Sequence, residues 1–349
     1  MMETPHRRQD SGARAAAFLV VLAILLVQGA GLMPGRIGLW ADARNYGPWS
    51  GSVGQNDRPQ PTMVLDSLRY SLAEWTLAHE ELGKGRLPLW NPYIFSGFDN
   101  AGSIQPAVFS PLKIILALLP PGRGMTLHLL LHTLLLGLGT VLLVRGRGGA
   151  GSAAAMAGVT VALNGYLVAK MGQPTAVATL GWLPLLLWSQ DRFFRRPRRR
   201  QAGVLVLLLL AAALAGHPPY FIYMLLTLAL FAAASLWRSP PSRERFCSML
   251  VWGGVALALV GVGTSILPVA RGWAGRTSRP LATAERPPLT RPAPQALWGL
   301  LVPEPMGSAA RGSYAPPAVK LPRGETLGIW HAGVFIYPGV LVWLLLPLA

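Results

Sequence analysis

Eight apolar runs of membrane-spanning length divide the sequence and constrain its fold more than any other feature. A helix needs about 20 apolar residues to cross a bilayer, and the chain is 52% hydrophobic and only 13% charged, as in polytopic membrane proteins. The runs predict an all-α transmembrane bundle that forms a single domain over residues 1–349. They are Ala15–Met33, Met125–Val144, Ser152–Lys170, Thr175–Gln190, Ala202–Gly216, Tyr220–Trp237, Cys247–Ala270 and Gly333–Ala349.

Two apolar segments allow another interpretation. Ala15–Met33 follows three arginines and could be a secretory signal, but it is long for one and no small-residue cleavage site follows it. We therefore expect a retained anchor. Val108–Pro120 is short and contains Pro111 and Lys113, so we expect an interfacial or re-entrant helix there rather than a span.

The arginine residues predict which side of the membrane each loop faces. With a cytoplasmic N-terminus, the inner segments 1–14, 145–151, 191–201 and 238–246 hold 14 basic and four acidic residues. Short inner loops rich in Arg follow the positive-inside rule, and the stretch DRFFRRPRRR alone contains six Arg. The net charge of +17 is thus a topology signal, and we expect a lipid bilayer rather than a nucleic acid as partner. The single Cys247 excludes an intrachain disulfide and a cysteine-based metal site.

This topology places two long loops, 34–111 and 271–332, on the extracytoplasmic side. The second loop is rich in Pro, Arg and Gly, which favours extended stretches. The first, called loop one below, contains VLDSLRYSLAEWTLAHEELGKG, which predicts an amphipathic helix along the membrane surface that ends at Gly83 and Gly85. Its apolar stripe is Leu65, Leu68, Leu72, Trp75 and Leu82, and its charged residues, mostly off that stripe, are Asp66, Arg69, Glu74, Glu80 and Glu81.

Loop one also holds seven of the 14 acidic residues, which makes it the best place for an active site if this protein is an enzyme. Asp42 follows the first span closely and has Trp40, Tyr46 and Trp49 as neighbours, an arrangement typical of a membrane interface. A carboxylate there could meet the head group of a membrane-dissolved substrate. An ordinary solvated loop residue remains the alternative.

Several stretches together resemble the YfhO-like bacterial membrane proteins of the GT-C superfamily of integral-membrane glycosyltransferases. They are ADARNYGPW, GRLPLWNPYIFSGFDNAGSIQPAVFSPL, AGHPPYFIY, ILPVARGWAGRTSRP and LWGLLVPEPMGS, in that order over about residues 15–345. The resemblance implies a multi-pass protein of the bacterial inner membrane. It also implies transfer of a sugar from a polyprenyl-phosphate carrier to a cell-envelope acceptor at the outer face.

The resemblance gives Asp42 the role of general base toward the acceptor hydroxyl, or of ligand to a divalent cation, Mg²⁺ or Mn²⁺, on the donor phosphate. Asp99 is a candidate second acid, since Asp42 has no acidic neighbour. Members of the family are usually much longer, so we expect a truncated or incomplete member. A membrane transporter or scaffold that binds a lipid-linked substrate without catalysis, or an inactive fragment, remains the alternative.

Further residues are candidates for substrate binding. His217, Arg271 and Arg279 lie at or beyond outer ends of spans and could hold the donor phosphate, or could be turn and loop residues. Asn91 and Gln105 belong to the most specific motif, although Asn91 before Pro92 could only fix a turn. Tyr46 and Trp49 are interfacial candidates. His128 and His132 are four residues apart on one helical face but lack an evident third ligand, which disfavours a metal site.

Overall fold

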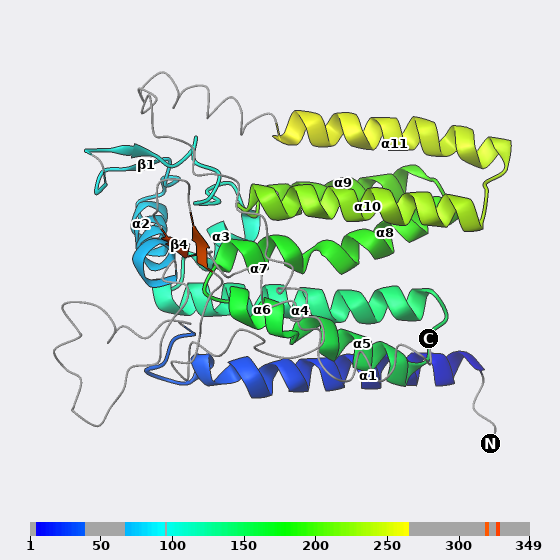
Figure 1. Ribbon diagram of the computed structural model, residues 1–349, viewed down its shortest axis with the longest axis horizontal. Helices are drawn as coiled ribbons and strands as arrows, with labels where there is room; N and C mark the ends of the chain where they lie inside the picture. The colour runs from blue at the N-terminus through cyan, green and yellow to red at the C-terminus, as the bar shows by residue number, and fades with distance from the viewer. Residues whose placement is uncertain (1–4, 39–66, 95, 265–317, 321–325, 329–349) are drawn as a thin grey trace.

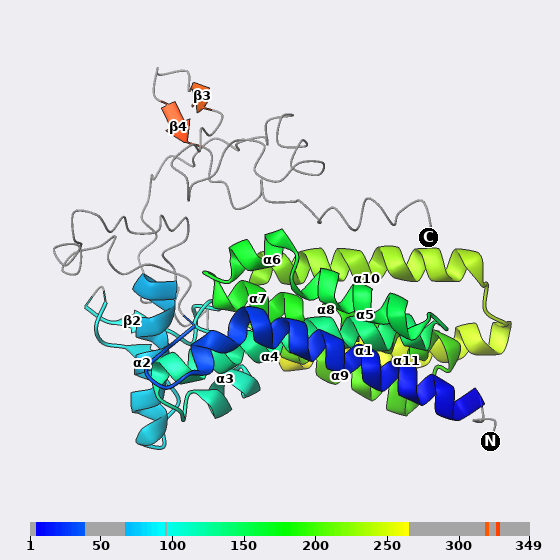
Figure 2. The ribbon, with the colours of Figure 1, turned by 90° about the horizontal axis from the view of Figure 1, so that it is seen from below.

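The computed structural model describes residues 5–38, 67–94, 96–264, 318–320 and 326–328. These are mostly helical, in agreement with the predicted all-α class. The long helices lie side by side in a bundle, and short elements gather at one end of it (Figures 1 and 2). The helices are α1 Pro5–Gln28, α2 Leu72–Gly83, α3 Pro111–Leu116, α4 Pro121–Gly146, α5 Gly151–Ala162, α6 Gly165–Lys170, α7 Pro174–Gly181, α8 Leu183–Arg195, α9 Arg199–Ala213, α10 Pro218–Arg238 and α11 Arg243–Thr264.

Short elements complete the described chain. A 3₁₀ turn, Gly29–Leu32, follows α1, and a π-helical turn, Ser67–Ser71, precedes α2. Strands β1 (Trp90–Asn91) and β2 (Phe98–Asp99) form an antiparallel hairpin, and β3 (Ala318–Lys320) pairs antiparallel with β4 (Thr326–Gly328).

Five helical segments in the described part of the chain are long and apolar enough to cross a membrane. They coincide with five of the predicted runs and are Gly12–Leu32, Pro121–Gly146, Gly151–Val168, Pro218–Arg238 and Arg243–Val262. The predicted run Gly333–Ala349 lies outside the described residues.

The two remaining predicted spans form shorter helices than expected. Thr175–Gln190 is divided between α7 and α8, because Pro184 has no N–H to continue the helical ladder. Ala202–Gly216 corresponds to α9, whose 15 residues rise about 22 Å, less than the thickness of a hydrocarbon core. Within Ser152–Lys170, Asn164 ends α5 and caps α6 by accepting a hydrogen bond of 2.9 Å from the amide of Leu167.

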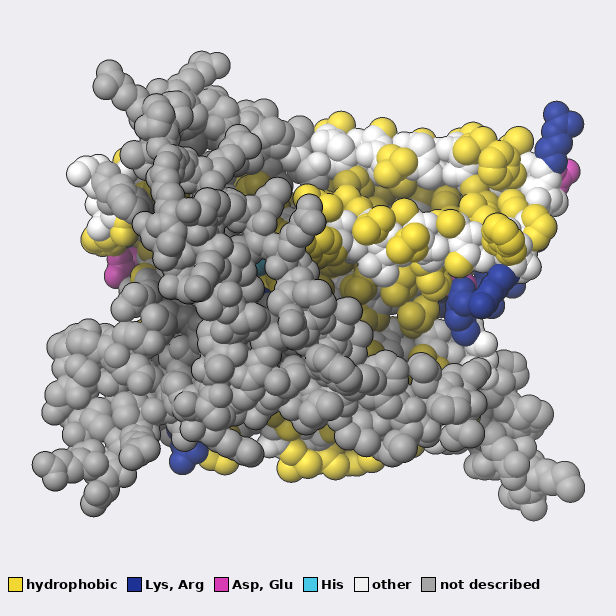
Figure 3. Space-filling view, viewed as in Figure 1, with side chains coloured by type: hydrophobic (Ala, Val, Ile, Leu, Met, Phe, Trp, Pro, Cys, Tyr) yellow, Lys and Arg dark blue, Asp and Glu magenta, His cyan; other side chains and the backbone are white. Residues whose placement is uncertain are grey.

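Helix α4 is the centre of the bundle and contacts α1, α5, α7 and α8. Small residues allow the close approach: a Cβ on Gly137 would lie 2.6 Å from Val20, and one on Gly158 would lie 2.7 Å from the same side chain. Helix α11 packs on α9, and α10 packs mainly on α8 and α7. Large apolar side chains such as Leu26, Leu230 and Leu257 face outward, forming the apolar band visible in Figure 3.

The two ends of the bundle differ in character. One end, called the arginine end, carries the turns that join α4 to α5, α8 to α9 and α10 to α11 (Figures 1 and 3). The other, called the loop end, carries α2, α3, β1 and β2. Helix α2 lies across the bundle axis there, as the predicted surface helix would, and packs on α4 through Trp75, Ala78 and Met125.

Candidate functional site

The chain that leads into the aromatic part of loop one is fixed at the loop end. After the 3₁₀ turn, the amide of Gly38 donates a hydrogen bond of 2.7 Å to the hydroxyl of Thr126, in the second turn of α4. A Cβ on Gly31 would lie 2.9 Å from the Gly38 nitrogen, so glycine permits this close approach. Asp42, Tyr46 and Trp49 begin four residues further on and lie outside the described residues.

A buried carboxylate organises the described part of the loop end. Glu74 in α2 is 4% exposed. Its two oxygens accept hydrogen bonds of 3.0 Å from Asn91 and 2.8 Å from Asn100. The sequence pattern lists Glu74 with the charged residues mostly off the apolar stripe of this helix, whereas in the structure its carboxylate is buried. Because both partners come from the hairpin region, Glu74 joins α2 to the β1–β2 segment, and these three residues are called the Glu74 cluster.

A buried lysine lies beside this cluster. The ammonium group of Lys113 donates a hydrogen bond of 2.6 Å to the carbonyl oxygen of Pro106 and lies 5.4 Å from the centre of a Trp75 ring. Burial lowers the pKa of Lys113 to about 8, and the nearby charge of Glu74 opposes that shift. Lys113 thus holds the 100–110 loop against α2 and α3.

Two candidates from the most specific motif take positions in the hairpin. Asn91 is 5% exposed, and besides its bond to Glu74 it accepts one of 3.0 Å from the amide of Tyr93. Asp99 pairs with Trp90 across the ladder and accepts a hydrogen bond of 2.9 Å from the amide of Gly102. Both side chains therefore shape the loop directly, Asn91 through the turn function that its sequence context allows.

A second polar cluster surrounds a lysine at the end of α6. Lys170 is only 5% exposed, and its ammonium group lies 5.7 Å from the ring centre of Tyr166 and 6.0 Å from that of Tyr220. The two tyrosine hydroxyls are hydrogen-bonded to each other, and Lys170 donates a bond of 3.3 Å to the side-chain oxygen of Gln173. These residues, together with His217, are called the Lys170 cluster.

His217 enters this cluster through its ring, whose centre lies 4.4 Å from that of Tyr220. The preceding Gly216 has a φ of +93°, and a Cβ there would lie 2.7 Å from Ala107 and 3.1 Å from the carbonyl oxygen of Gln105. The fold thus brings the Gln105 loop next to the Gly216–His217 turn, although seven helices, α3 to α9, separate them in the chain. The Gln105 side chain itself is exposed. The phosphate candidates Arg271 and Arg279 lie outside the described residues.

His128 and His132 belong to a line of aromatic rings. The His128 ring contacts Trp75 at 5.3 Å and His132 at 4.3 Å, and His132 contacts Trp182 at 5.9 Å, measured between ring centres. His132 Nδ1 also bonds the carbonyl oxygen of His128. Among the described residues, no group of three or more His, Cys, Asp or Glu side chains could hold a metal ion.

The burial of Lys113 and Lys170 was difficult to predict from local sequence. Lys170 ends an apolar run, where a lysine usually extends to water, and Lys113 lies inside the short run Val108–Pro120, where an interfacial helix is expected. The Tyr166–Lys170 spacing of four residues places both side chains on one helical face, which is the one local signal. Tyr220 is 54 residues from Tyr166, so their contact depends on how α6 and α10 pack.

The loop end therefore offers one buried carboxylate cluster, which is structural, and one buried cation among tyrosines. A cation with aromatic hydroxyls can bind a phosphate ester by charge and hydrogen bonds. Comparison of the chain with protein-family models, with curated proteins and with solved structures finds no match.

Proposed function

We propose that this protein transfers a sugar from a polyprenyl-phosphate carrier to a cell-envelope acceptor at the outer face of a bacterial inner membrane. One observation carries the proposal: a buried lysine with two tyrosines and a histidine lies at the loop end, where loop one also begins. This is the set of groups that a lipid-linked phosphate requires at the edge of a bilayer.

The orientation of the bundle supports sugar transfer at the outer face of the membrane. The arginine end carries Arg145 and Arg147, six arginines between residues 191 and 201, and three between 238 and 246. The positive-inside rule assigns such an end to the cytoplasm. The loop end then faces outward, where sugars on polyprenyl carriers are transferred in the family that the sequence resembles.

The chemistry divides between two sets of residues. Lys170, His217 and the tyrosine hydroxyls bind the phosphate and stabilise the negative charge that develops on it as the bond between the sugar's anomeric carbon and the phosphate oxygen breaks. The acceptor oxygen forms the new bond to the anomeric carbon, and its proton moves to Asp42. Connectivity keeps Asp42 near the loop end of α4, because it follows the anchored Gly38 by four residues, a reach of at most about 14 Å.

A second function, binding of the lipid-linked substrate without catalysis, is favoured by the partners of the described carboxylates. Glu74 is held by two asparagines, Glu81 pairs with Lys84 and Arg86, and Asp99 binds the Gly102 amide. These three carboxylates of the described chain are already held by local partners, so the transfer that we propose depends on Asp42, and without its participation the Lys170 cluster would only bind.

The full chain reconstituted in vesicles with radiolabelled polyprenyl-phosphate sugars tests both functions. Label that leaves the lipid fraction and appears on an envelope acceptor supports transfer, and a parallel sample with chelator tests the role of Mg²⁺ or Mn²⁺. Carrier binding without label transfer, with every envelope fraction supplied as acceptor, would favour the non-catalytic function. Failure of both binding and transfer would reject the proposal.

A further inference from the structure

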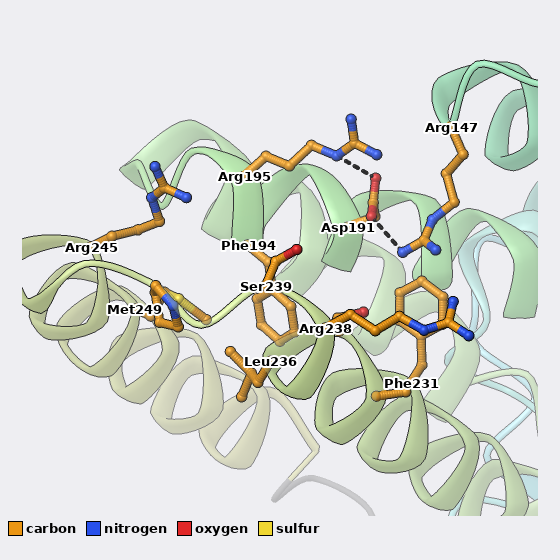
Figure 4. A pocket seen from close by; sticks show the side chains of 13 residues that line it. Arg147, Asp191, Phe194, Arg195, Phe231, Leu236, Arg238, Ser239, Arg245 and Met249 are labelled. Carbon is orange, nitrogen blue, oxygen red and sulfur yellow. Dashed lines mark hydrogen bonds and ion pairs between the residues drawn. The ribbon is translucent and has the colours of Figure 1, made fainter.

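A pocket opens at the arginine end, at the opposite end of the bundle from the Glu74 and Lys170 clusters. It has a volume of about 740 Å³ and lies between the end of α8, the end of α10 and the first turns of α11 (Figure 4). Its charged and aromatic lining includes Arg147, Asp191, Arg195, Phe231, Arg238 and Arg245. The volume is in the range of small-molecule sites.

The charge of the pocket is strongly unbalanced. Asp191 is its one acidic residue, and this carboxylate pairs with Arg147 at 2.8 Å and with Arg195 at 2.9 Å. The Arg147 guanidinium also lies 4.8 Å from the ring centre of Phe231, which fixes its plane. Four arginines against one aspartate leave an excess of three positive charges around the cavity.

Two of the arginines have no such compensation. Arg238 ends α10 and Arg245 lies in the first turn of α11, and the part of the chain that the structure describes contains no ion-pair partner for either. In Figure 4 the guanidinium groups surround the apolar side chains of Phe194, Leu236 and Met249. The pocket therefore combines a basic rim with an apolar floor.

The surroundings of the pocket favour a lipid over a soluble ligand. Trp237, beside Arg238, is 90% exposed, as expected of an aromatic residue at a membrane interface. Leu230 on α10 and Leu250 on α11 are 63% and 61% exposed, so the two helices that border the pocket also carry exposed apolar side chains. A ligand with a phosphate at the rim and acyl chains along these helices would match both features.

We propose that this pocket binds the phosphate head group of an anionic phospholipid. Arginine forks bind phosphate oxygens in pairs of hydrogen bonds, and basic pockets between membrane helices on the cytoplasmic side are suited to anionic lipids. Topology alone does not require this arrangement, because five of the six arginines in the stretch 191–201 give positive charge to the same end without lining the cavity, and only Arg195 does line it. The proposal is independent of Asp42 and of sugar transfer.

Native mass spectrometry of the full chain in detergent tests lipid binding by this pocket, with phosphatidylglycerol, phosphatidylcholine and glycerol 3-phosphate as separate probes. The pocket variant is Arg238→Gln with Arg245→Gln. The matched control is Arg196→Gln with Arg198→Gln, which removes the same charge from exposed arginines at the same end that do not line the pocket. All four side chains are exposed, so both variants are expected to fold.

We expect phosphatidylglycerol to bind more tightly than phosphatidylcholine. The pocket variant should weaken phosphatidylglycerol binding about 25-fold, at about fivefold for each arginine, and the control should change it less than about twofold. Equal weakening in both variants would overturn the proposal, since general attraction of charge would then explain the binding. If glycerol 3-phosphate bound as tightly as phosphatidylglycerol, the proposal that the ligand is a lipid would be overturned.

Discussion

The backbone amide of Gly38 and the hydroxyl of Thr126 are joined by a hydrogen bond of 2.7 Å, across 88 residues of sequence. The bond fixes the start of the aromatic stretch that contains Asp42 to the top of the central helix α4. Thr126 also donates to the carbonyl oxygen of Gly122, so its hydroxyl donates one hydrogen bond within α4 and accepts the other from Gly38. The position of this one hydroxyl is thus a direct link between the fold and the proposed chemistry.

Thr126→Val tests that link, because it removes the hydroxyl and nearly keeps the shape. The loss of one neutral hydrogen bond costs about 1 kcal/mol, and we expect sugar transfer to fall about fivefold. Thr126→Ser keeps the hydroxyl and should retain most activity. Transfer rates in vesicles measure the effect, and a valine variant as active as the serine variant would show that the anchor does not matter.

The Glu74 cluster predicts a loss of stability rather than of chemistry. Glu74→Ala leaves the amides of Asn91 and Asn100 buried without their acceptor, and we expect the free energy of unfolding to fall by about 2–4 kcal/mol. Glu80→Ala, on the exposed face of the same helix, should change it by less than about 0.5 kcal/mol. Thermal unfolding in detergent measures both, and equal shifts would mean that the buried network contributes little.

Lys113 predicts a dependence of stability on pH. Its pKa is lowered from 10.5 to about 8 by burial, so between these values the unfolded chain binds more protons than the folded protein and stability rises with pH. The cost of the buried charge is present in full below pH 8 and disappears toward pH 10.5, an amount of about 3 kcal/mol.

The comparison of wild type with Lys113→Met isolates this contribution from that of other titrating groups. The free energy of unfolding of the wild type, relative to that of Lys113→Met, should rise between pH 8 and pH 10.5. Lys84→Met, at an exposed lysine on the same side of the bundle, should show no such change. A pH dependence shared by wild type and Lys113→Met would contradict the assignment.

The local sequence predicts the helices well and their breaks less well. Apolar periodicity and length locate α1, α4, α10 and α11, because those signals depend on neighbouring residues alone. The sequence contains the signals for both breaks, since Asn164 is an N-cap residue and Pro184 is a proline. Averaging hydropathy over an apolar window hides these single residues.

The candidate site shows the same limit more strongly. The burial of Glu74 could not be predicted, since its partners Asn91 and Asn100 come from 17 and 26 residues away. On a helical wheel Glu74 lies off the predicted stripe of Leu72, Trp75 and Leu82, and its contacts with the packed hairpin make it an interior group. The approach of Gln105 to Gly216 likewise depends on packing between distant segments.

The Lys170 cluster predicts how donor binding responds to charge. Lys170→Gln removes the cation that we propose binds the donor phosphate, and the KM for the polyprenyl-phosphate sugar should then rise about tenfold or more, with a smaller change in kcat. Lys170→Arg should recover part of the affinity because it restores the charge. Lys84→Gln is the control at an exposed lysine. An unchanged KM in Lys170→Gln would remove this cluster from the donor site.

The central claim is that Asp42 accepts the proton of the acceptor hydroxyl, and the transfer rate of Asp42→Asn tests it most directly. The asparagine keeps the size of the side chain and cannot act as the base, whereas Asp57→Asn makes the same change elsewhere in loop one. General-base catalysis is worth at least about 100-fold. We expect Asp42→Asn to lose at least that factor in label transfer while it still binds the carrier, with Asp57→Asn close to wild type. Transfer by Asp42→Asn at the wild-type rate would contradict the account.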